Sequence, residues 1–282
     1  MASGAGERFR MAGGTGSKLL TSIDGPLGEV PLVVQTAASV PDDLFEIAVV
    51  AWRSEVDSVV RFAGLNVAVV SPCVDIQPRR SDTVRAGAAY ADARGWDGVL
   101  FLPGDQPLVM RESFRALAEA FTRDPSRACR LSWRGVPGSP VLFPARCIPV
   151  LMALQGSDGG SSLFRSGELE VSLTEAREAC ELIDVDIPAD LERIKEACRS
   201  GVIWKSYRPL RVSAFRALHS CETDERRSLG EGSSSQSALA GFKCAAAGRF
   251  AGIRRIWRRG TSDGAPQRRS APAALLGHRR LG

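Results

Sequence analysis

Histidine is scarce in this sequence of 282 residues, and long hydrophobic runs are absent. The two histidines, His219 and His278, both lie in the last third of the chain. No run of eighteen apolar residues is present, so we expect no membrane-spanning helix. The first ten residues include Glu7, Arg8 and Arg10 and contain no apolar segment, so we expect no secretory signal.

The seven cysteines are scattered, and no two of them form a C-x-x-C pair. This spacing argues against a zinc site or a disulfide framework. It is typical of proteins in a reducing cytoplasm, which is the location we expect. The cysteines are Cys73, Cys129, Cys147, Cys180, Cys198, Cys221 and Cys244.

Charge divides the chain into two parts. Residues 1–198 carry 20 Lys and Arg against 27 Asp and Glu, a net charge of −7, whereas residues 199–282 carry 17 against 5, a net charge of +12. The second part is rich in Gly and Ser at 228–237 and has little apolar surface to offset the entropy cost of ordering. We therefore predict one folded domain over 1–200 and a basic, mostly disordered tail over 201–282.

Short apolar runs alternate with amphipathic stretches in the first part of the chain. This alternation predicts parallel crossover units, with helices on both faces of a sheet. The expected fold class is therefore α/β: a three-layer, Rossmann-like domain with a mostly parallel sheet. Strands are expected at 47–51, 67–70, 98–102, within 129–143, at 169–173 and at 181–185, and helices at 55–63, 82–93, 111–121, 148–154, 161–166 and 189–198.

Glycines and basic residues begin the chain. Gly4 and Gly6 precede Arg8, and Lys18 follows ten residues later. Glycine lets backbone N–H groups approach a phosphate closely, and the two cations supply charge for a triphosphate. The same composition is common in flexible N-termini, so this segment alone does not establish a site.

A second candidate site follows the apolar run at 98–102. Gly104, Asp105, Gln106 and Pro107 come directly after it, and ligands of open α/β sheets gather at the carboxyl ends of strands. Magnesium usually takes one or two carboxylates together with phosphate oxygens, so Asp105 is a candidate metal ligand. The alternative is that Asp105 caps the helix that follows.

A third group of acids lies near the end of the predicted domain. On a strand, Asp184 and Asp186 would point to the same side. Asp186 is therefore a candidate second metal ligand, across the sheet from Asp105. Pro188 is expected to begin a helix, and for Asp190, in its first turn, we prefer a capping role near the positive end of the helix dipole.

Taken together in chain order, these three candidate segments resemble those of the MobA-like nucleotidyltransferases, particularly the molybdenum cofactor cytidylyltransferases. The resemblance covers roughly residues 2–198. The Gly-Asp-Gln-Pro turn matches the family residue for residue and looks more like its cytidylyl branch than its guanylyl branch. The other matching segments are 2–9 with 18–20, 80–87, 135–143, 156–160 and 184–191.

The resemblance implies a GT-A-like domain that transfers CMP from CTP to molybdenum cofactor, a molybdopterin, and releases pyrophosphate with Mg²⁺ as cofactor. It gives Arg8 and Lys18 catalytic roles, with Lys18 on the α-phosphate. The nucleotide-binding residues it implies are Gly4, Gly6, Ser81, Thr83 and Gly104; the metal ligands are Asp105 and Asp186; the residues on the pterin side are Gly138, Ser139, Pro140 and Asp158.

Four positions depart from the family pattern. Met1 falls where the first strand should end, so we expect that strand to be truncated. Ser139 stands in place of a histidine, Ser157 occupies an acidic position, and Ile187 replaces a threonine. The last three departures concern the pterin side more than the nucleotide side.

Other substrates remain open, because a fold does not fix a substrate. The alternatives are guanylyl transfer from GTP to the same cofactor, and cytidylyl transfer to a sugar or isoprenoid phosphate. An alternative of another class is an inactive truncated domain whose basic tail binds nucleic acid nonspecifically. The tail has few aromatic residues among its charges, so we do not expect specific nucleic-acid binding. The resemblance also implies a molybdoenzyme that accepts the finished cofactor.

Overall fold

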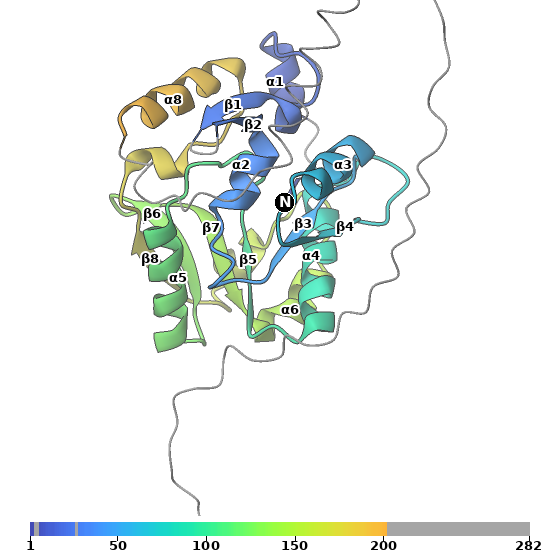
Figure 1. Cartoon of the computed structure of the whole chain (residues 1–282). Helices are drawn as coiled ribbons and strands as arrows, with labels where there is room; N and C mark the ends of the chain where they lie inside the picture. The colour runs from blue at the N-terminus through green and yellow to red at the C-terminus, as the bar shows by residue number, and fades with distance from the viewer. Residues whose placement is uncertain (3–5, 26–27, 202–282) are drawn as a thin grey trace, which may run out of the picture. The chain divides into compact units, whose positions relative to one another are not determined.

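The computed structural model describes residues 1–2, 6–25 and 28–201 (Figure 1). The helices in this part are α1 (Glu7–Met11), η1 (Lys18–Leu20), α2 (Leu32–Ser39), α3 (Ser54–Phe62), α4 (Arg80–Arg94), α5 (Arg111–Arg123), η2 (Ala145–Cys147), α6 (Ile148–Met152), α7 (Ser161–Arg165), η3 (Ala179–Leu182) and α8 (Pro188–Arg199), where η marks a 3-10 helix. The strands are β1 (Ser22–Gly25), β2 (Gly28–Pro31), β3 (Ile47–Val50), β4 (Val67–Val70), β5 (Gly98–Phe101), β6 (Ala128–Trp133), β7 (Val136–Pro144) and β8 (Val171–Glu175).

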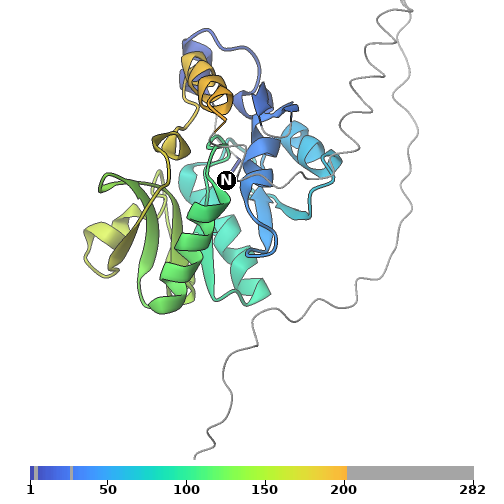
Figure 2. The ribbon, with the colours of Figure 1, turned by 60° about the vertical axis from the view of Figure 1, so that its left-hand side comes forward.

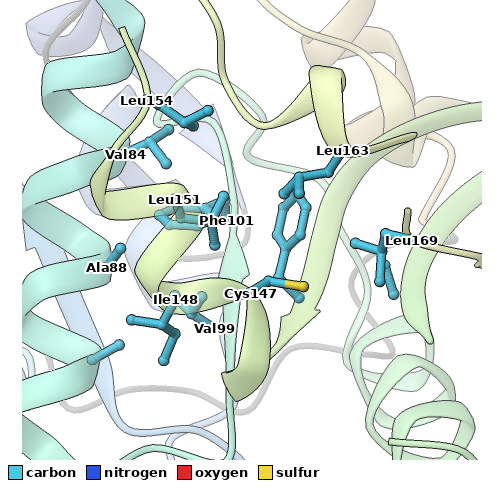
Figure 3. Close-up of a cluster of buried hydrophobic side chains, with 13 residues drawn as sticks. Val84, Ala88, Val99, Phe101, Cys147, Ile148, Leu151, Leu154, Leu163 and Leu169 are labelled. Carbon is cyan, nitrogen blue, oxygen red and sulfur yellow. The ribbon is translucent and has the colours of Figure 1, made fainter. Parts of the chain in front are cut away.

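Helices pack on both faces of the sheet formed by β5, β7, β6 and β8 in that order. Side chains alternate along a strand. Val99 and Phe101 of β5 join the buried cluster that contains Ala88 of α4, whereas Leu100 packs against the cluster that contains Phe114 of α5. Figure 3 shows Val99 and Phe101 among side chains of α4 and α6. In Figure 1, α4 and α5 flank the strands, and Figure 2 shows the same helices after a turn of the view. The predicted three-layer α/β class is confirmed.

The first two residues lie between β3 and β5. The N–H group of Ala2 donates to the Val50 carbonyl at 2.9 Å. On the other side, the Met1 amino group donates to the Leu102 carbonyl at 2.7 Å, and the Gly104 N–H donates back to the Met1 carbonyl at 2.7 Å. Met1 and Ala2 therefore connect the parallel β3–β4 pair to β5, in the place that the resemblance assigns to a central first strand.

The sheet is mixed rather than mostly parallel. The pairs β3–β4 and β6–β8 are parallel, but β7 is antiparallel to both β5 and β6. Arg134 (φ 51°) and Gly135 (φ 77°) form the two-residue connection between β6 and β7. Two successive positive φ angles are typical of a tight hairpin turn, and a hairpin makes its two strands antiparallel. The sequence predicts strands within 129–143 and a mostly parallel sheet, and the antiparallel direction of β7 corrects the second of these predictions.

A smaller assembly lies beside the carboxyl edge of the sheet. The β1–β2 hairpin is antiparallel, and Ile23 of β1 packs with Ile194 of α8 in one buried cluster. Val185 belongs to the same cluster, and its N–H donates to the Asp105 carbonyl at 3.0 Å. This assembly therefore holds the acidic segment before α8 close to the turn after β5.

The strand predicted at 181–185 is wrong. Glu181 is fully buried, and its carboxylate accepts the N–H groups of Arg177 at 2.7 Å and Glu178 at 3.0 Å. These bonds fold the chain into the 3-10 turn η3, and residues 183–187 continue without regular secondary structure. Strand alternation therefore cannot be the reason that Asp184 and Asp186 lie near each other.

Some sequence predictions fall outside the described residues. They are the predicted disorder of the tail beyond residue 201 and any role of Gly4. In the part of the chain that the structure does describe, none of the helices has the length and apolar character needed to cross a membrane.

Candidate active site

Close backbone packing fixes the turn after β5. A Cβ atom on Gly104 would lie 2.7 Å from the Met1 carbonyl oxygen and 3.3 Å from the Ala2 Cα, so a larger residue does not fit without a backbone shift. Thr36 of α2 donates its hydroxyl to the Gly104 carbonyl at 3.0 Å. Gly104 therefore places Asp105 at the carboxyl end of β5, beside Met1 and Ala2. A contact between Gly104 and a nucleotide stays a prediction.

Two carboxylates and two cations meet at this edge of the sheet. Lys18 Nζ donates to Asp105 Oδ2 at 2.5 Å and lies 3.7 Å from Asp186 Oδ1. Arg8 Nη1 donates to Asp186 Oδ2 at 3.0 Å. The side chains of Lys18 and Asp105 are 12% and 19% exposed, so solvent screens their interaction less than that of Arg8, which is 79% exposed. The structure therefore brings together the predicted catalytic cations and the predicted metal ligands.

A third carboxyl group, Asp184, stands beside this pair. Desolvation is the main cause that raises its pKa from the ordinary value of 3.8 to about 6, and the negative charges of Asp105 and Asp186 act in the same direction. The positive charges of Lys18 and Arg80 oppose the rise of the pKa. Asp184 as a whole remains exposed, so solvent screens part of these interactions. Asp184 is nevertheless near enough to both candidate metal ligands to interact with their charges.

Gly6 brings the start of α1 next to Lys18. Its φ of 65° lies in the left-handed region that favours glycine, and its carbonyl accepts the N–H of Arg10 at 3.1 Å. A Cβ atom on Gly6 would lie 3.5 Å from the Lys18 Cβ. The backbone of Gly6 and the side chain of Lys18 therefore lie next to each other, and their contact with a phosphate stays a prediction.

Ser81 and Thr83, which are predicted to approach the base, are both buried in the first turns of α4. The Ser81 hydroxyl donates to the Gly156 carbonyl at 2.8 Å, and the Thr83 hydroxyl lies 3.5 Å from the Arg79 carbonyl. Ser81 therefore ties α4 to the loop at 156–160. A contact of either hydroxyl with a base stays a prediction.

Asp158 shapes the loop that Ser81 holds. Its Oδ1 accepts the Gly160 N–H at 2.9 Å and the Ser161 hydroxyl at 3.2 Å. Desolvation would raise the pKa of Asp158, but the hydrogen bonds that it accepts, beginning with one from Ser162, outweigh desolvation and lower the pKa. Asp158 thus has a local structural role here, and its predicted contact with the pterin stays a prediction.

The predicted pterin-side segment lies in β7, next to the turn that carries Asp105. Gln106 Nε2 donates to the Ser139 carbonyl at 2.9 Å, and the peptide bond between Ser139 and Pro140 is cis. A Cβ atom on Gly138 would lie 1.9 Å from Leu182 Cδ2, so this part of β7 packs closely against the end of η3. The structure therefore joins the Gly-Asp-Gln-Pro turn to the matched segment at 135–143, although substrate contact by Gly138, Ser139 and Pro140 stays a prediction.

Three residues of the site have no role in the sequence prediction. Gln106 and Glu181 are almost completely buried and connect segments of the site. Arg80 is near both Asp184 and the loop at 156–160. Its charge opposes the rise of the pKa of Asp184, and a Cβ atom on Gly159 would lie 2.6 Å from Arg80 Cδ. Gln106 and Arg80 lie inside matched motifs, next to Asp105 and Ser81, which are predicted site residues. Glu181 could have been found from its spacing, because it follows Glu178 by three residues, which is the spacing of a capping box.

The pair of acids fits a magnesium ion in its chemistry. Asp105 and Asp186 both reach Lys18 Nζ, so their oxygens converge on one point. Magnesium prefers hard oxygen ligands and often takes only one or two carboxylates, with water and phosphate oxygens completing its shell. Within the described ranges, no group of three or more His, Cys, Asp or Glu side chains is arranged to hold a metal. Water or phosphate oxygens would complete the shell of an ion held by these two acids, and Mg²⁺ stays a prediction.

A family model described as the MobA-like NTP transferase domain matches residues 1–172. The chain belongs to this family. The match covers more than half of the chain and reaches into β8, so it contains five of the six segments on which the resemblance was based. The family predicted from the sequence is confirmed, and with it the general class of nucleotidyltransferase. The cytidylyl branch is a finer assignment that this match does not decide.

One similar curated protein is the purine catabolism protein PucB of Bacillus subtilis (strain 168). The two sequences are 29% identical over 126 residues, which are 44% of this chain and 60% of PucB. The chain thus matches less than two thirds of the length of that relative.

Solved structures of MobA-like and related proteins share the fold. A nucleotidyl transferase from Methanothermobacter thermautotrophicus has a TM-score of 0.58 at 24% identity, covering 71% of this chain and 95% of that one. The molybdopterin-guanine dinucleotide biosynthesis protein A of Archaeoglobus fulgidus has a TM-score of 0.50 at 14% identity, covering 71% and 96%. The 4-diphosphocytidyl-2C-methyl-D-erythritol synthase of Anaerococcus prevotii has a TM-score of 0.51 at 16% identity, covering 66% and 94%. At these identities the likeness establishes the fold alone.

Proposed function

We propose that this MobA-like protein is a magnesium-dependent cytidylyltransferase that transfers CMP from CTP to molybdenum cofactor and releases pyrophosphate. The observation that carries the proposal is the convergence of Asp105 and Asp186 on Lys18, beside Gly6 and at the carboxyl end of β5. The choice of CTP rests on the Gly-Asp-Gln-Pro turn, which resembles the cytidylyl branch.

The reaction is one displacement at phosphorus. A terminal phosphate oxygen of the molybdopterin attacks the α-phosphorus of CTP and forms a new P–O bond. The bond between the α-phosphorus and the oxygen that bridges it to the β-phosphate breaks, and pyrophosphate leaves with that electron pair. Such a reaction needs in-line positioning and neutralised charge more than a covalent intermediate. A phosphate nucleophile is already anionic, so a histidine base is not required.

Lys18 and Arg8 would stabilise the phosphates. In this structure both cations pair with carboxylates, Lys18 with Asp105 and Arg8 with Asp186. We expect these pairs to rearrange when CTP binds, so that Lys18 contacts the α-phosphate and Arg8 the triphosphate. Bound Mg²⁺ would neutralise charge on the phosphate oxygens, with Asp105 and Asp186 as its protein ligands.

The remaining predicted residues would bind the two substrates. Gly4, Gly6 and Gly104 would allow close approach of the triphosphate, and Ser81 and Thr83 would lie near the cytosine. The pterin would bind toward Asp158 and the segment of β7 that contains Ser139. A cytoplasmic protein with a molybdoenzyme as the recipient of its product is the cellular setting that we propose.

A pyrophosphate-release assay tests the proposed function. The full chain is incubated with Mg²⁺ and molybdenum cofactor, and CTP, GTP and ATP are compared at equal concentration. We expect release with CTP and formation of the cytosine dinucleotide form of the cofactor, identified by mass spectrometry. Release with GTP alone would replace the cytidylyl assignment by guanylyl transfer, and release with none of the nucleotides from folded protein would contradict the proposal.

A further inference from the structure

A buried side-chain amide connects three segments of the candidate site. Gln106 is 1% exposed, and its Nε2 donates to the Ser139 carbonyl at 2.9 Å and to the Glu181 carbonyl at 2.8 Å. Its Oε1 has no hydrogen-bond partner within the described part of the chain. Burying an unpaired acceptor is unfavourable, and an apolar side chain of similar size would avoid this cost. The amide is therefore explained by its two donated bonds rather than by packing.

Glu181 continues this connection with its own side chain. One carboxylate oxygen accepts the N–H of Met110, directly before α5, at 2.9 Å, and the other accepts the N–H groups of Arg177 and Glu178. A fully buried carboxylate with three backbone donors is rigidly oriented. Glu181 thus fixes η3 to the start of α5, while its carbonyl receives the bond from Gln106.

These bonds lie directly beside the two candidate metal ligands. Gln106 follows Asp105 in the chain, and the Asp105 carbonyl accepts the N–H of Val185, the residue before Asp186. The turn that carries Asp105 is therefore joined at two places to the segment that carries Asp186. One is the bond from Gln106 to the Glu181 carbonyl, and the other is the bond from the Val185 N–H to the Asp105 carbonyl. In Figure 1 the chain before α8 passes beside the segment between β5 and α5.

We propose that Gln106 and Glu181 are positioning residues that set the separation and orientation of Asp105 and Asp186. They touch neither a nucleotide nor a metal; they act through the backbone that carries the two carboxylates. Loss of a buried partner of a metal-binding group typically weakens metal affinity about 10-fold to 100-fold. The functional half of this inference rests on the metal role given to the two acids under the proposed function.

The positioning itself is tested without any metal or substrate. Amide hydrogen exchange is measured by NMR at Val185 in wild type, in Gln106→Leu and in the control Ile148→Val, which trims a buried side chain of α6 far from this network. We expect faster exchange at Val185 in Gln106→Leu than in the control. Each variant is measured at the same number of degrees below its own melting temperature. Equal exchange at Val185 in the two variants would overturn the inference. If Gln106→Leu does not fold, Gln106→Asn, whose shorter amide cannot reach both carbonyls, takes its place.

The consequence for the acids is tested by Mn²⁺ binding in the presence of CTP, followed by electron paramagnetic resonance of the full chain. We expect the Mn²⁺ affinity of Gln106→Leu and of Glu181→Gln to fall about 10-fold, with no change in Ile148→Val. Affinity equal to wild type in both site variants would overturn the positioning role, whatever the exchange result. If wild type itself binds no Mn²⁺, the metal role in the proposed function fails, and exchange at Val185 still decides whether Gln106 joins the two segments.

Discussion

Both candidate metal ligands reach the ammonium group of Lys18, so Lys18 is the first residue at which to test the proposed chemistry. Replacement by methionine keeps the length of the side chain and removes the charge proposed to stabilise the α-phosphate. We expect Lys18→Met to lower kcat for pyrophosphate release by about 100-fold or more, the usual effect of removing a donor aimed at developing charge.

The matched control for that substitution is Lys195→Met. Lys195 pairs with Glu192 on the exposed side of α8, at 2.6 Å, and exposed pairs of this kind contribute little. We expect its kcat to equal that of wild type. Equal activity of Lys18→Met and Lys195→Met would show that the ammonium group is not used in the reaction.

The pKa of Asp184 predicts a pH-dependent stability difference. Its folded-state pKa of about 6 lies above its ordinary value of 3.8, so between these values the native protein binds more protons than the unfolded chain, and stability falls as the pH rises. Above pH 6 the ionised Asp184 carboxylate continues to destabilise the folded protein. Asp184→Asn should therefore melt at a higher temperature than wild type at pH 8, and the difference should shrink toward pH 4.

Differential scanning fluorimetry without metal, over that pH range, measures this difference. The effect is expected to be small because Asp184 is exposed and partly screened. A difference in melting temperature that grows as the pH falls would contradict the sign of the pKa shift. As a control, Asp57→Asn changes an exposed carboxylate that pairs with Arg61 and lies outside the site.

At the start of α4, the Ser81 side chain forms a hydrogen bond to the loop at 156–160. Ser81→Ala removes the hydroxyl that binds the Gly156 carbonyl, and we expect a loss of about 1 kcal/mol, or roughly 2–4 °C in melting temperature for a domain of this size. Ser54→Ala is the control, because its exposed hydroxyl, at the start of α3, bonds only weakly to Glu55 at 3.4 Å. Equal melting temperatures of the two variants would show that Ser81 does not hold the loop at 156–160.

The elements that sequence analysis placed well are those that bury a continuous apolar run. The strands β3, β4 and β5 and the helices α3, α4 and α5 all begin within two residues of their predicted starts, because apolar periodicity follows directly from burial. The 181–185 segment looked like a strand because Leu182, Ile183 and Val185 are apolar. It folds differently because the buried Glu181 carboxylate binds the N–H groups of Arg177 and Glu178, and this local contact does not follow from the apolar pattern.

At the scale of the whole molecule, the layered α/β fold was predictable, and the direction of its strands was not. The chain reverses direction at Arg134 and Gly135 because both residues have positive φ angles, and the identities of these two residues do not predict those angles. Sequence motifs single out Lys18 and Asp105, which lie in contact in the structure, and their roles stay predictions. Gln106 was not assigned, because its role depends on carbonyl groups 33 and 75 residues away in the chain.

We propose that this MobA-like protein transfers a nucleotide with the help of the carboxylates of Asp105 and Asp186. The most direct measurement compares Mg²⁺-dependent pyrophosphate release from CTP and molybdenum cofactor by wild type, Asp105→Asn and the exposed control Asp57→Asn. We predict that Asp105→Asn loses at least about 100-fold in rate while it remains folded, and that Asp57→Asn matches wild type. Release by folded Asp105→Asn at the wild-type rate would contradict the account.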